Sequence, residues 1–315
     1  MDGMIGIYKE KGYTSHDVVA RMRGILKIKK IGHTGTLDPE AEGVLPVAIG
    51  AATKLCDMFS DRSKTYRAVI RLGISTDTED MTGTVTAEDE NWKGLTDDKI
   101  ISAVDSFAGE YEQIPPMYSA LKVDGHKLYE YARKGIEIER KPRLLNIYDI
   151  KTTSIDLPWV SIEVTCSKGT YIRTLSKDIG AKLSCNACMQ SLLRTRVSDF
   201  CMEDAITLAE LEKIRDEGRL AEYIKPVYDI YSFLDSALAL EAANKRLING
   251  NSIPAEYVSI TEKGKGDGCL TGDFTGCVRM SDHLHSFIGI YRYSKDTDEY
   301  IPEKLFFVNN GGSNR

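Results

Sequence analysis

The chain has no long apolar segments. Among its 315 residues, no unbroken apolar run approaches the roughly 20 residues that span a bilayer. Residues 1–25 also lack the continuous apolar core of a secretion signal. These two absences exclude a membrane-spanning protein and predict no membrane partner. We therefore expect the protein to act in the cytoplasm.

Cysteines are few, and they are irregularly spaced. Their number, seven, is odd, and the chain is large enough to bury a core without disulfide bonds, which predicts a reducing compartment. Cys185 and Cys188 have no partner pair at zinc spacing and follow a predicted helix, unlike the cysteines of a thioredoxin motif. His283 and His285 lie in a polar, turn-like stretch, and residues 76–80 lack the spacing of a calcium loop. We expect no metal ion.

Glycine does not occur in the spacing that cradles a phosphate group. Neither a Walker-type loop nor a dinucleotide-binding fingerprint is present, so no nucleotide cofactor is predicted. Together with the missing metal ligands, this pattern predicts a protein that works without a cofactor. The composition, 42% apolar and 28% charged, is that of an ordinary globular protein of two domains.

Positive charge is not in excess overall, but it is unevenly distributed. The net charge is −6, yet seven basic residues lie between Lys9 and Lys30. Eight acidic residues lie between Asp77 and Asp98, with Lys93 as the one basic residue among them. Phosphate groups respond to a local basic groove rather than to the mean charge. We therefore keep nucleic acid as a partner and expect the acidic stretch to be a solvated edge that faces away from it.

Strands and helices do not alternate regularly along the chain, which favours an α+β sheet over a doubly wound one. Alternating or apolar runs predict strands, and apolar residues at helical spacing predict helices. The predicted strands are 4–8, 64–73, two within 142–167, and 190–197. The predicted helices are one capped by Ser15, one over 96–108 and one over 170–183.

The segment around 230–250 has the features of a domain boundary. Ser236–Leu247 is predicted to be a helix that ends at Asn249-Gly250-Asn251, with Pro254 just beyond. Short β-like pieces separated by glycines follow, including Cys277–Met280 and Phe287–Tyr293. We predict a first domain over residues 1–235 and a small β domain over 236–315, within the usual range of domain sizes.

One short stretch places a single aspartate among glycines, threonines and a proline. It reads Gly32-His33-Thr34-Gly35-Thr36-Leu37-Asp38-Pro39 and runs on to Gly43-Val44-Leu45-Pro46. Pro39 keeps Asp38 out of the helical region, so the carboxylate is presented from a loop. An isolated Asp-Pro would only start a turn. The whole run, however, closely resembles the catalytic loop of the TruB family of tRNA pseudouridine synthases, in which this Asp is the nucleophile.

Four further segments match the same family in the right order, so the resemblance covers most of residues 3–200. Lys64-Thr65-Tyr66 is similar to its K-x-Y motif, and 113–120 (QIPPMYSA) to the segment that opens an RNA-gripping insertion. Residues 166–175 (CSKGTYIRTL) resemble its S-K-G-T-Y-I-R-T motif, and 192–200 (LLRTRVSDF) its closing strand. Ser198 stands where many members have glycine. The C-terminal segment weakly resembles the family's PUA-like RNA-binding module.

The resemblance implies roles for the residues of a pocket that takes a flipped-out uridine. Asp38 would be the nucleophile, and it must stay ionised, so Arg173 would supply the guanidinium group that opposes the effect of burial on its pKa. A carboxylate can attack either the ribose or the uracil ring, and the sequence is compatible with both. Tyr66 would act as a base in proton removal. Without the resemblance, Arg173 and Tyr66 would be an ordinary helix arginine and a half-buried strand tyrosine.

The remaining predicted site residues would hold the RNA. By resemblance, Tyr171 stacks on the flipped base and Leu192 packs near it, which recovers part of the cost of unstacking. His33 would fill the gap that the base leaves. Basic residues of the K-x-Y motif and of the insertion, about 110–143, would contact the phosphates of the T stem-loop; they are Lys64, Lys122, Arg140, Lys141 and Arg143. A solvated helix face is the plainer explanation of these insertion charges.

The resemblance implies a pseudouridine synthase fold, with a central mixed, mainly antiparallel sheet flanked by helices and a small C-terminal β domain. It implies an isomerase that converts uridine 55 in the T loop of tRNA, works as a monomer without an obligatory protein partner, and can also assist tRNA folding. One alternative is a guide-RNA-dependent relative of the archaeal and eukaryotic type; the start of the fold at Gly3 and the insertion at 129–143 favour the stand-alone form. The other is an RNA-folding protein without catalysis, which an intact Asp38 and Arg173 disfavour.

Overall fold

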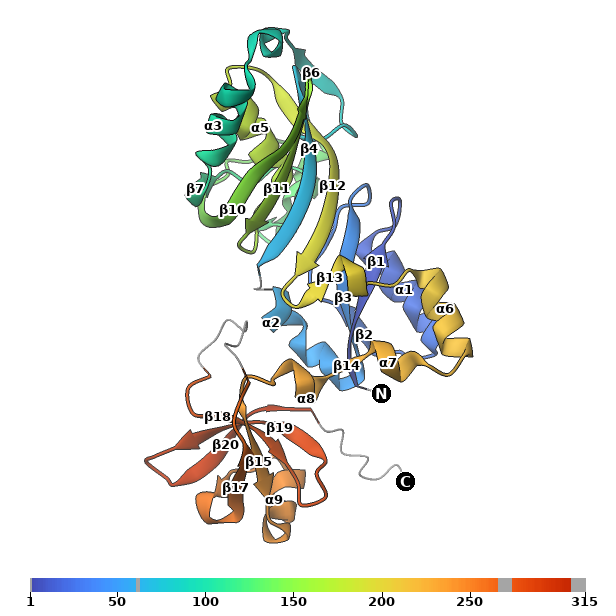
Figure 1. The fold of residues 1–315 in the computed structure, drawn as a ribbon, viewed down its shortest axis with the longest axis vertical. Helices are drawn as coiled ribbons and strands as arrows, with labels where there is room; N and C mark the ends of the chain where they lie inside the picture. The colour runs from blue at the N-terminus through green and yellow to red at the C-terminus, as the bar shows by residue number, and fades with distance from the viewer. Residues whose placement is uncertain (1, 61–62, 266–273, 307–315) are drawn as a thin grey trace.

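The computed structural model describes residues 2–60, 63–265 and 274–306. Its elements build a ten-stranded sheet, a six-stranded sheet and two two-stranded sheets, with helices packed against the two large ones. In Figure 1 the large sheet fills the upper and middle parts of the molecule, and the small sheet lies below it. Within these described residues, no helix is long and apolar enough to cross a membrane.

The large sheet has the strand order β14-β1-β3-β12-β4-β11-β10-β7, with β2 paired to β3 and β13 paired to β12. Its strands are β1 (Gly3–Lys9), β2 (Ile31–His33), β3 (Glu42–Ile49), β4 (Lys64–Leu72), β7 (Gly109–Gln113), β10 (Arg143–Asp156), β11 (Trp159–Cys166), β12 (Ala187–Val197), β13 (Phe200–Cys201) and β14 (Lys225–Pro226). All of these pairs are antiparallel except β3 with β12. The predicted mixed, mainly antiparallel sheet is confirmed.

The parallel pair of β3 and β12 is a short seam between the two halves of this sheet. It contains only the partners Leu193 with Glu42 and Arg194 with Gly43. Gly43 has a φ of +109°, and a Cβ there would lie 2.2 Å from the Arg194 carbonyl oxygen, so this close approach requires glycine. The loop that carries Asp38 enters β3 at this point. The seam therefore holds the predicted catalytic loop between the two halves.

Helices cover each half of the large sheet. The upper half packs against α3 (Asp97–Asp105) and α5 (Ile172–Lys182), which lie on the same face in Figure 1. The lower half packs against α1 (Ser15–Leu26) and α6 (Leu208–Asp216), which contact each other. Smaller elements complete this part: α2 (Cys56–Ser60), α4 (Leu128–Ala132), α7 (Leu220–Tyr223), α8 (Val227–Ile230), η1 (Gly50–Leu55), η2 (Asn91–Gly94), η3 (Met202–Asp204), β5 (Ile74–Thr76), β6 (Val85–Glu88), β8 (Lys122–Val123) and β9 (His126–Lys127).

The predicted cap of α1 is wrong by one residue. Thr14, not Ser15, is the N-cap, because its hydroxyl accepts from Asp17 N at 3.1 Å while the Asp17 carboxylate accepts from Thr14 N at 2.8 Å. Ser15 is fully buried instead, and its hydroxyl accepts from Leu37 N at 2.9 Å. Ser15 therefore braces the loop of Asp38.

The small sheet has the order β16-β20-β19-β18-β15-β17. Its elements are β15 (Asp235–Ala239), η4 (Glu241–Ala243), α9 (Asn244–Ile248), β16 (Ile253–Pro254), η5 (Ala255–Tyr257), β17 (Val258–Glu262), β18 (Cys277–Ser281), β19 (Phe287–Ser294) and β20 (Glu299–Leu305). The strands predicted at Cys277–Met280 and Phe287–Tyr293 are present, and so is the C-terminal β domain. The large sheet ends at Pro226 and the small one begins at Asp235; the division at residues 235 and 236 stays a prediction.

The helix predicted over Ser236–Leu247 is wrong in its first half. Residues 235–239 form β15, which pairs with β17 on one side and β18 on the other. The run Ser-Ala-Leu-Ala-Leu contains good helix formers, but the ladder bonds to two neighbouring strands override this local preference. Only the second half is helical, as η4 and α9.

An apolar cluster joins the two sheets. It combines Met4, Leu55 and Phe59 with Tyr231 and Phe306, all of them buried. Lys54 Nζ also donates to the Leu305 carbonyl oxygen at 2.7 Å. The two sheets therefore share one packed contact rather than lying apart on a linker.

Candidate active site

A cavity of about 460 Å³ opens where the loop of Asp38, the upper half of the sheet and the start of α5 meet. Its walls come from that loop, β4, the insertion, the turn before α5 and β12. Six of the predicted site residues line it: Asp38, Lys64, Tyr66, Tyr171, Arg173 and Leu192. Residues that are distant in the sequence thus share one site, which is large enough for a nucleobase.

Buried bonds hold the loop of Asp38 in place. Lys9 is fully buried, and its Nζ donates to the carbonyl oxygens of Ala41 at 2.6 Å, Pro39 at 3.1 Å and Glu10 at 3.1 Å. Burial lowers the pKa of Lys9, and nearby carboxylates partly oppose this. Lys9 thus fixes the backbone of the loop just after Asp38. It was not foreseen from the sequence, where it counted only as a positive charge.

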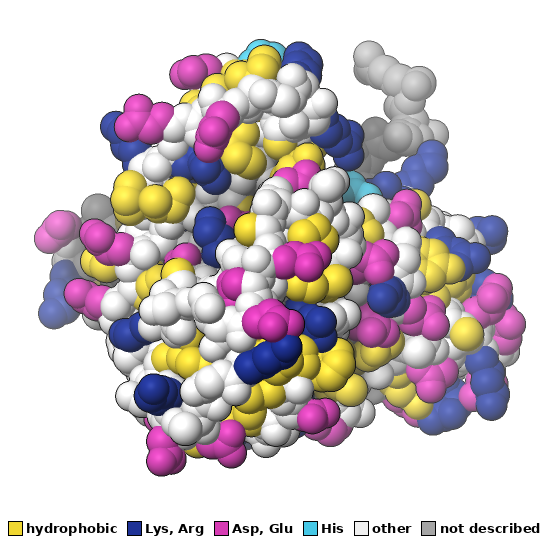
Figure 2. Space-filling view, turned by 90° about the horizontal axis from the view of Figure 1, so that it is seen from above, with side chains coloured by type: hydrophobic (Ala, Val, Ile, Leu, Met, Phe, Trp, Pro, Cys, Tyr) yellow, Lys and Arg dark blue, Asp and Glu magenta, His cyan; other side chains and the backbone are white. Residues whose placement is uncertain are grey.

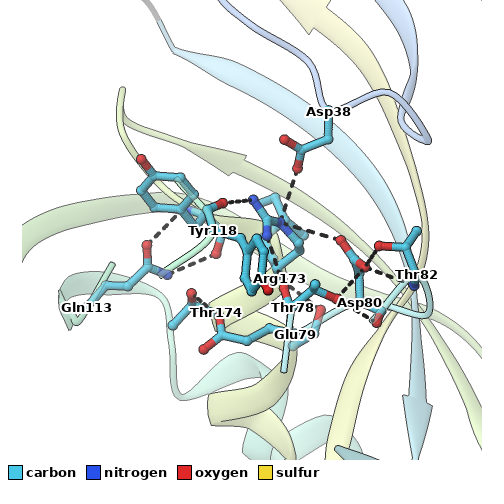
Figure 3. A network of polar contacts seen from close by, with 12 residues as sticks. Asp38, Thr78, Glu79, Asp80, Thr82, Gln113, Tyr118, Arg173 and Thr174 are labelled. Carbon is cyan, nitrogen blue, oxygen red and sulfur yellow. Dashed lines mark hydrogen bonds and ion pairs between the residues drawn. The ribbon is translucent and has the colours of Figure 1, made fainter. Parts of the chain in front are cut away.

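Arg173 is the centre of the polar network in this cavity (Figure 3). Its side chain is 7% exposed, and its Nε lies 3.1 Å from Oδ2 of Asp38. Nη1 donates to the Thr78 carbonyl oxygen at 3.0 Å, and Nη2 donates to that of Tyr118 at 2.9 Å. Bonds on three sides leave the guanidinium group little freedom to rotate. The predicted ion pair between Asp38 and Arg173 is present in the structure.

The Asp38 carboxylate lies at the mouth of the cavity. Its side chain is 44% exposed, whereas that of Arg173 is almost fully covered. A buried Asp38 carboxylate, as the resemblance implies, is therefore wrong for the free protein. The arrangement instead leaves the carboxylate accessible to an incoming group while the cation beneath it is fixed.

A second carboxylate shares Arg173. Oδ2 of Asp80 lies 3.7 Å from Arg173 Nε, and Oδ1 accepts from Thr82 N at 2.9 Å and from the Thr78 hydroxyl at 2.8 Å. Figure 3 shows Asp38 and Asp80 approaching the guanidinium group from different sides. Asp80 is therefore placed to orient Arg173 toward Asp38.

The acidic stretch 77–98 is consequently not a uniformly solvated edge, as the sequence analysis expected. The side chains of Glu79 and Asp80 are 9% and 14% exposed. Glu79 accepts from the Thr174 hydroxyl at 2.5 Å and from Lys177 Nζ at 2.8 Å, both on α5. The interspersed threonines of 76–82 were the signal available in the sequence, because they are the residues that cap and orient carboxylates in a tight turn.

Tyr66 and Arg194 form a buried pair at the back of the cavity. Tyr66 is 8% and Arg194 1% exposed. Burial raises the pKa of Tyr66 to about 12, although Arg194 and its hydrogen bond to the phenol lower it. Arg194 Nε also donates to the Val44 carbonyl oxygen at 2.8 Å, across the seam. The phenol is thus protonated at neutral pH, and its service as a base stays a prediction. Arg194 was quoted in a motif but given no role.

Gln113 clamps the backbone of Tyr171. Its side-chain nitrogen donates to the Tyr171 carbonyl oxygen at 2.9 Å, and its oxygen accepts from Tyr171 N at 2.8 Å. Gln113 belongs to the segment that opens the insertion, so this segment positions the predicted stacking residue. The paired amide contact was not foreseen from the sequence.

We expect Gln113→Ala to lower turnover more than RNA affinity. Without the clamp, the amide and carbonyl of Tyr171 lose buried partners, which costs about 1–3 kcal/mol. The ring of Tyr171 should then lose its fixed orientation. The expected single-turnover rate on a T-arm hairpin is about tenfold lower, close to that energy range. Gln190→Ala, at an exposed position of β12, is the matched control. An unchanged rate would mean that the clamp does not position Tyr171.

The hydrogen-bond network of Gln113 ends at Asp178, where the Tyr111 hydroxyl donates to Oδ2. Burial raises the pKa of Asp178, and this hydrogen bond opposes the rise only in part. The pKa of such a carboxyl group is higher in the folded than in the unfolded protein, where it is about 3.9. The group therefore stabilises the fold below about pH 3.9, and this stabilisation is lost as the pH rises through the pKa of the folded state. Asp178→Asn cannot titrate. The free energy of unfolding of Asp178→Asn, minus that of the wild type, should therefore increase from pH 4 to pH 7. Denaturant titrations at each pH measure this difference. A difference that is independent of pH would contradict this.

The basic residues of the insertion divide into two kinds. Lys122, Lys141 and Arg143 are exposed, and none forms an ion pair with another described residue. Arg140 is different, because its side chain is 20% exposed, donates to the Pro115 carbonyl oxygen at 3.1 Å and lies 3.5 Å from Glu137. Arg140 therefore braces the insertion. None of these four residues lines the cavity, and phosphate contacts remain a prediction for them.

His33 also lies outside the cavity. It is half-buried in β2, and its Nδ1 accepts from Gly35 N at 3.3 Å. Burial, together with His16 and Arg194, lowers the pKa of His33, so its ring is neutral at pH 7. The ring is thus tied to the loop that leads to Asp38, and its predicted role beside the flipped base stays a prediction.

Comparisons with known proteins agree with this geometry. Residues 23–172 match the model of the TruB family pseudouridylate synthase N-terminal domain, and 173–230 match that of the tRNA pseudouridylate synthase B C-terminal domain. A protein of Alkaliphilus oremlandii named tRNA pseudouridine synthase B is 45% identical over 93% of this chain and 98% of its own length. The protein of that name from Lachnoclostridium phytofermentans is also 45% identical, over 97% of this chain and 100% of its own.

Among solved structures, a chain of a Cbf5-Nop10-Gar1 complex superposes with a TM-score of 0.68 and 27% identity, over 97% of this chain and 85% of that one. A chain of an H/ACA RNP bound to a substrate RNA has the same TM-score at 24% identity, over 98% of this chain and 86% of its own, and so shares the fold. The family models together span most of the chain, and the curated relatives match it nearly end to end. The chain belongs to the TruB family of pseudouridylate synthases.

Proposed function

We propose that this protein isomerises uridine to pseudouridine at position 55 in the T loop of tRNA, with Asp38 as the nucleophile. The observation that carries the proposal is the Asp38 carboxylate, 3.1 Å from the fixed Arg173 guanidinium group at the mouth of a cavity of nucleobase size. The substrate comes from the curated relatives, which are 45% identical and are named tRNA pseudouridine synthase B.

The reaction breaks the bond between ribose C1′ and uracil N1, turns the base, and joins C1′ to C5. N1 gains a proton and C5 loses one, so the product is an isomer and no cofactor is consumed. The Asp38 carboxylate can attack C1′ and release the base, or add to the ring at C6; in both routes it is regenerated at the end. The geometry around Asp38 is compatible with either route, because its side chain is 44% exposed.

The side chains that form the pocket walls are placed to bind the extruded base. The target uridine must leave the stack, at a cost of a few kcal/mol, before Asp38 can reach it. Tyr171 is positioned by Gln113 to stack on the extruded ring, and Leu192 adds apolar contact. Tyr66, behind them, is the candidate for transfer of the C5 proton. Its pKa of about 12 makes the phenolate rare at neutral pH but strongly basic once formed.

We also propose that the protein acts alone, as a cytoplasmic monomer without guide RNA. Supporting this, the relatives named for tRNA cover almost the whole chain. The solved structures with partner proteins share only about a quarter of the residues.

The test is incubation of the purified protein with unmodified tRNA transcript, followed by mapping of pseudouridine. The expected result is modification at position 55 without added protein, guide RNA or metal, and none when that uridine is replaced by cytidine. A T-arm hairpin, consisting of one stem and its loop, should serve as well as tRNA because the cavity takes a single base. Tritium release from 5-tritiated uridine measures the rate. Modification elsewhere, or none, would contradict the proposal.

A further inference from the structure

A second cavity, of about 510 Å³, lies beside the catalytic loop. It is formed where α1, the loop after it, β2 and η1 come together, with Cys56 at its edge. The backbone of β2 packs closely against its neighbours here, because a Cβ on Gly32 would lie 3.2 Å from Cys56 Sγ and 3.7 Å from Thr53 Cγ2. His33 lines this cavity and bonds Gly35, which lines the first one. One residue, Thr34, therefore separates the linings of the two cavities along the chain.

The charge around the second cavity is of one sign. Arg23, Lys29 and Lys30 line it, and no Asp or Glu does. All three are exposed, and none forms an ion pair with another described residue. The Arg23 guanidinium group is anchored, because Nη2 donates to the Ile31 carbonyl oxygen at 2.9 Å. Three uncompensated cations around one hollow repel one another and favour an anion there.

Two histidines also line this cavity. His16 and His33 pack edge to face with ring centroids 5.2 Å apart. The pKa of His33 is lowered, first by burial and then by His16 and Arg194. The cavity therefore combines two aromatic rings with a cationic rim, which suits a nucleotide unit better than a compact, fully hydrated anion.

This local concentration of charge matters because charge is mixed elsewhere. The face in Figure 2 carries acidic and basic side chains interspersed, without a broad basic area. The protein as a whole has a net charge of −6. A nucleic-acid ligand must therefore be held by confined clusters of cations, and this one is the cluster nearest in sequence to the catalytic loop.

We infer that this cavity binds a backbone phosphodiester of the RNA strand that carries the target uridine. The inference rests on the proposed function and deepens it. The strand would pass from Asp38 over His33, and its phosphate would meet Lys29, Lys30 and the anchored Arg23. Exposed lysines on an open rim can contact a phosphate group of the RNA backbone, which lies on the outside of the polymer. A site for a small free anion would instead surround the anion with buried hydrogen-bond donors.

The test compares Lys29→Ala/Lys30→Ala with Lys93→Ala/Lys99→Ala, which removes the same charge near α3, in the upper half of the molecule. Both loop lysines are exposed, and the backbone there is held by Gly50 N donating to the Lys30 carbonyl oxygen at 2.8 Å, so folding should be unaffected. Thermal denaturation checks this. Filter binding of a T-arm hairpin is measured from low to high salt, together with single-turnover pseudouridine formation.

We expect Lys29→Ala/Lys30→Ala to bind the hairpin about tenfold more weakly at low salt and to flatten the log–log salt slope by about 1.4–1.8, since each phosphate contact contributes roughly 0.7–0.9. The rate at saturating hairpin should stay within about twofold of wild type. The control variant should change neither the affinity nor the slope by a comparable amount.

Hairpins with one neutral methylphosphonate, placed at successive positions of the T loop, then locate the contact. One such substitution should weaken wild-type binding but not add to the loss in Lys29→Ala/Lys30→Ala, because both remove the same interaction. Equal affinity and slope in the two double variants, or additive losses at every methylphosphonate, would overturn the inference. A wild-type protein that binds the hairpin but forms no pseudouridine would contradict the proposed function and leave the phosphate site to be judged by binding alone.

Discussion

Asp38→Asn is expected to lower the single-turnover rate of pseudouridine formation by at least about 10⁴-fold, as for loss of other enzyme nucleophiles. An amide cannot attack carbon, and it cannot balance the charge of Arg173. Binding of the same T-arm hairpin should stay within tenfold of wild type, or about 1.4 kcal/mol. Base flipping and phosphate contacts use other residues. The two quantities are measured by tritium release and by filter binding.

The matched control is Glu40→Gln on the same loop. Glu40 is exposed and pairs with Lys11 at 3.1 Å, so its loss should change neither rate nor affinity by more than about twofold, as expected for a surface ion pair. If Asp38→Asn loses affinity as severely as rate, Asp38 serves to hold the loop, and its assignment as nucleophile fails. If Asp38→Asn keeps both the rate and the affinity of the wild type, the protein acts on RNA without this carboxylate.

Arg173→Lys is the second substitution with a large expected effect, a loss of at least about 100-fold in rate, typical of removing one preorganised donor. Lysine keeps the charge but not the fork that reaches Asp38 and the carbonyl oxygens of Thr78 and Tyr118 together. Its ammonium group can turn toward Asp80 instead. We therefore expect turnover to fall far more than hairpin affinity.

Arg67→Lys provides the comparison for this change. Arg67 pairs with Glu163 at 2.9 Å on the open face of the sheet, and its side chain is 65% exposed, so the same substitution should be nearly silent there. Adding Asp80→Asn to Arg173→Lys tests the orienting role of Asp80. If Asp80 acts through Arg173, the double variant should lose little more than the single one. Full additivity would mean that the two side chains act separately.

Asp38→Asn also separates catalysis from RNA folding. A variant that binds but does not isomerise should keep any ability to refold a misfolded tRNA, because refolding needs contact with the RNA rather than bond breaking. Loss of refolding in step with isomerisation would show that catalysis and folding assistance are not distinct activities of this protein.

Local sequence determined the regular elements wherever pattern and packing agree. The alternation of Tyr66, Ala68, Ile70 and Leu72 predicted β4 because every second residue of this strand faces the core. The helix prediction for 236–239 failed because these residues favour a helix locally, whereas pairing with β17 and β18, which are distant in the chain, holds them in a strand. A window of sequence does not contain those partners.

For the site, the sequence by itself determined the chemical groups: a carboxylate on a Gly- and Pro-rich loop, a tyrosine on a strand and an arginine at the start of a helix. Only the tertiary structure decided which of them meet. Glu79 and Thr174 are 95 positions apart yet hydrogen-bonded, and Asp80 reaches Arg173 across a similar separation. Three side chains that hold the site act on backbone groups, which every residue supplies: those of Gln113, Arg194 and Lys9. Composition and spacing therefore do not predict these contacts. Hydrogen bonds depend on distance and direction in space, and those are set when the two halves of the sheet join at Gly43.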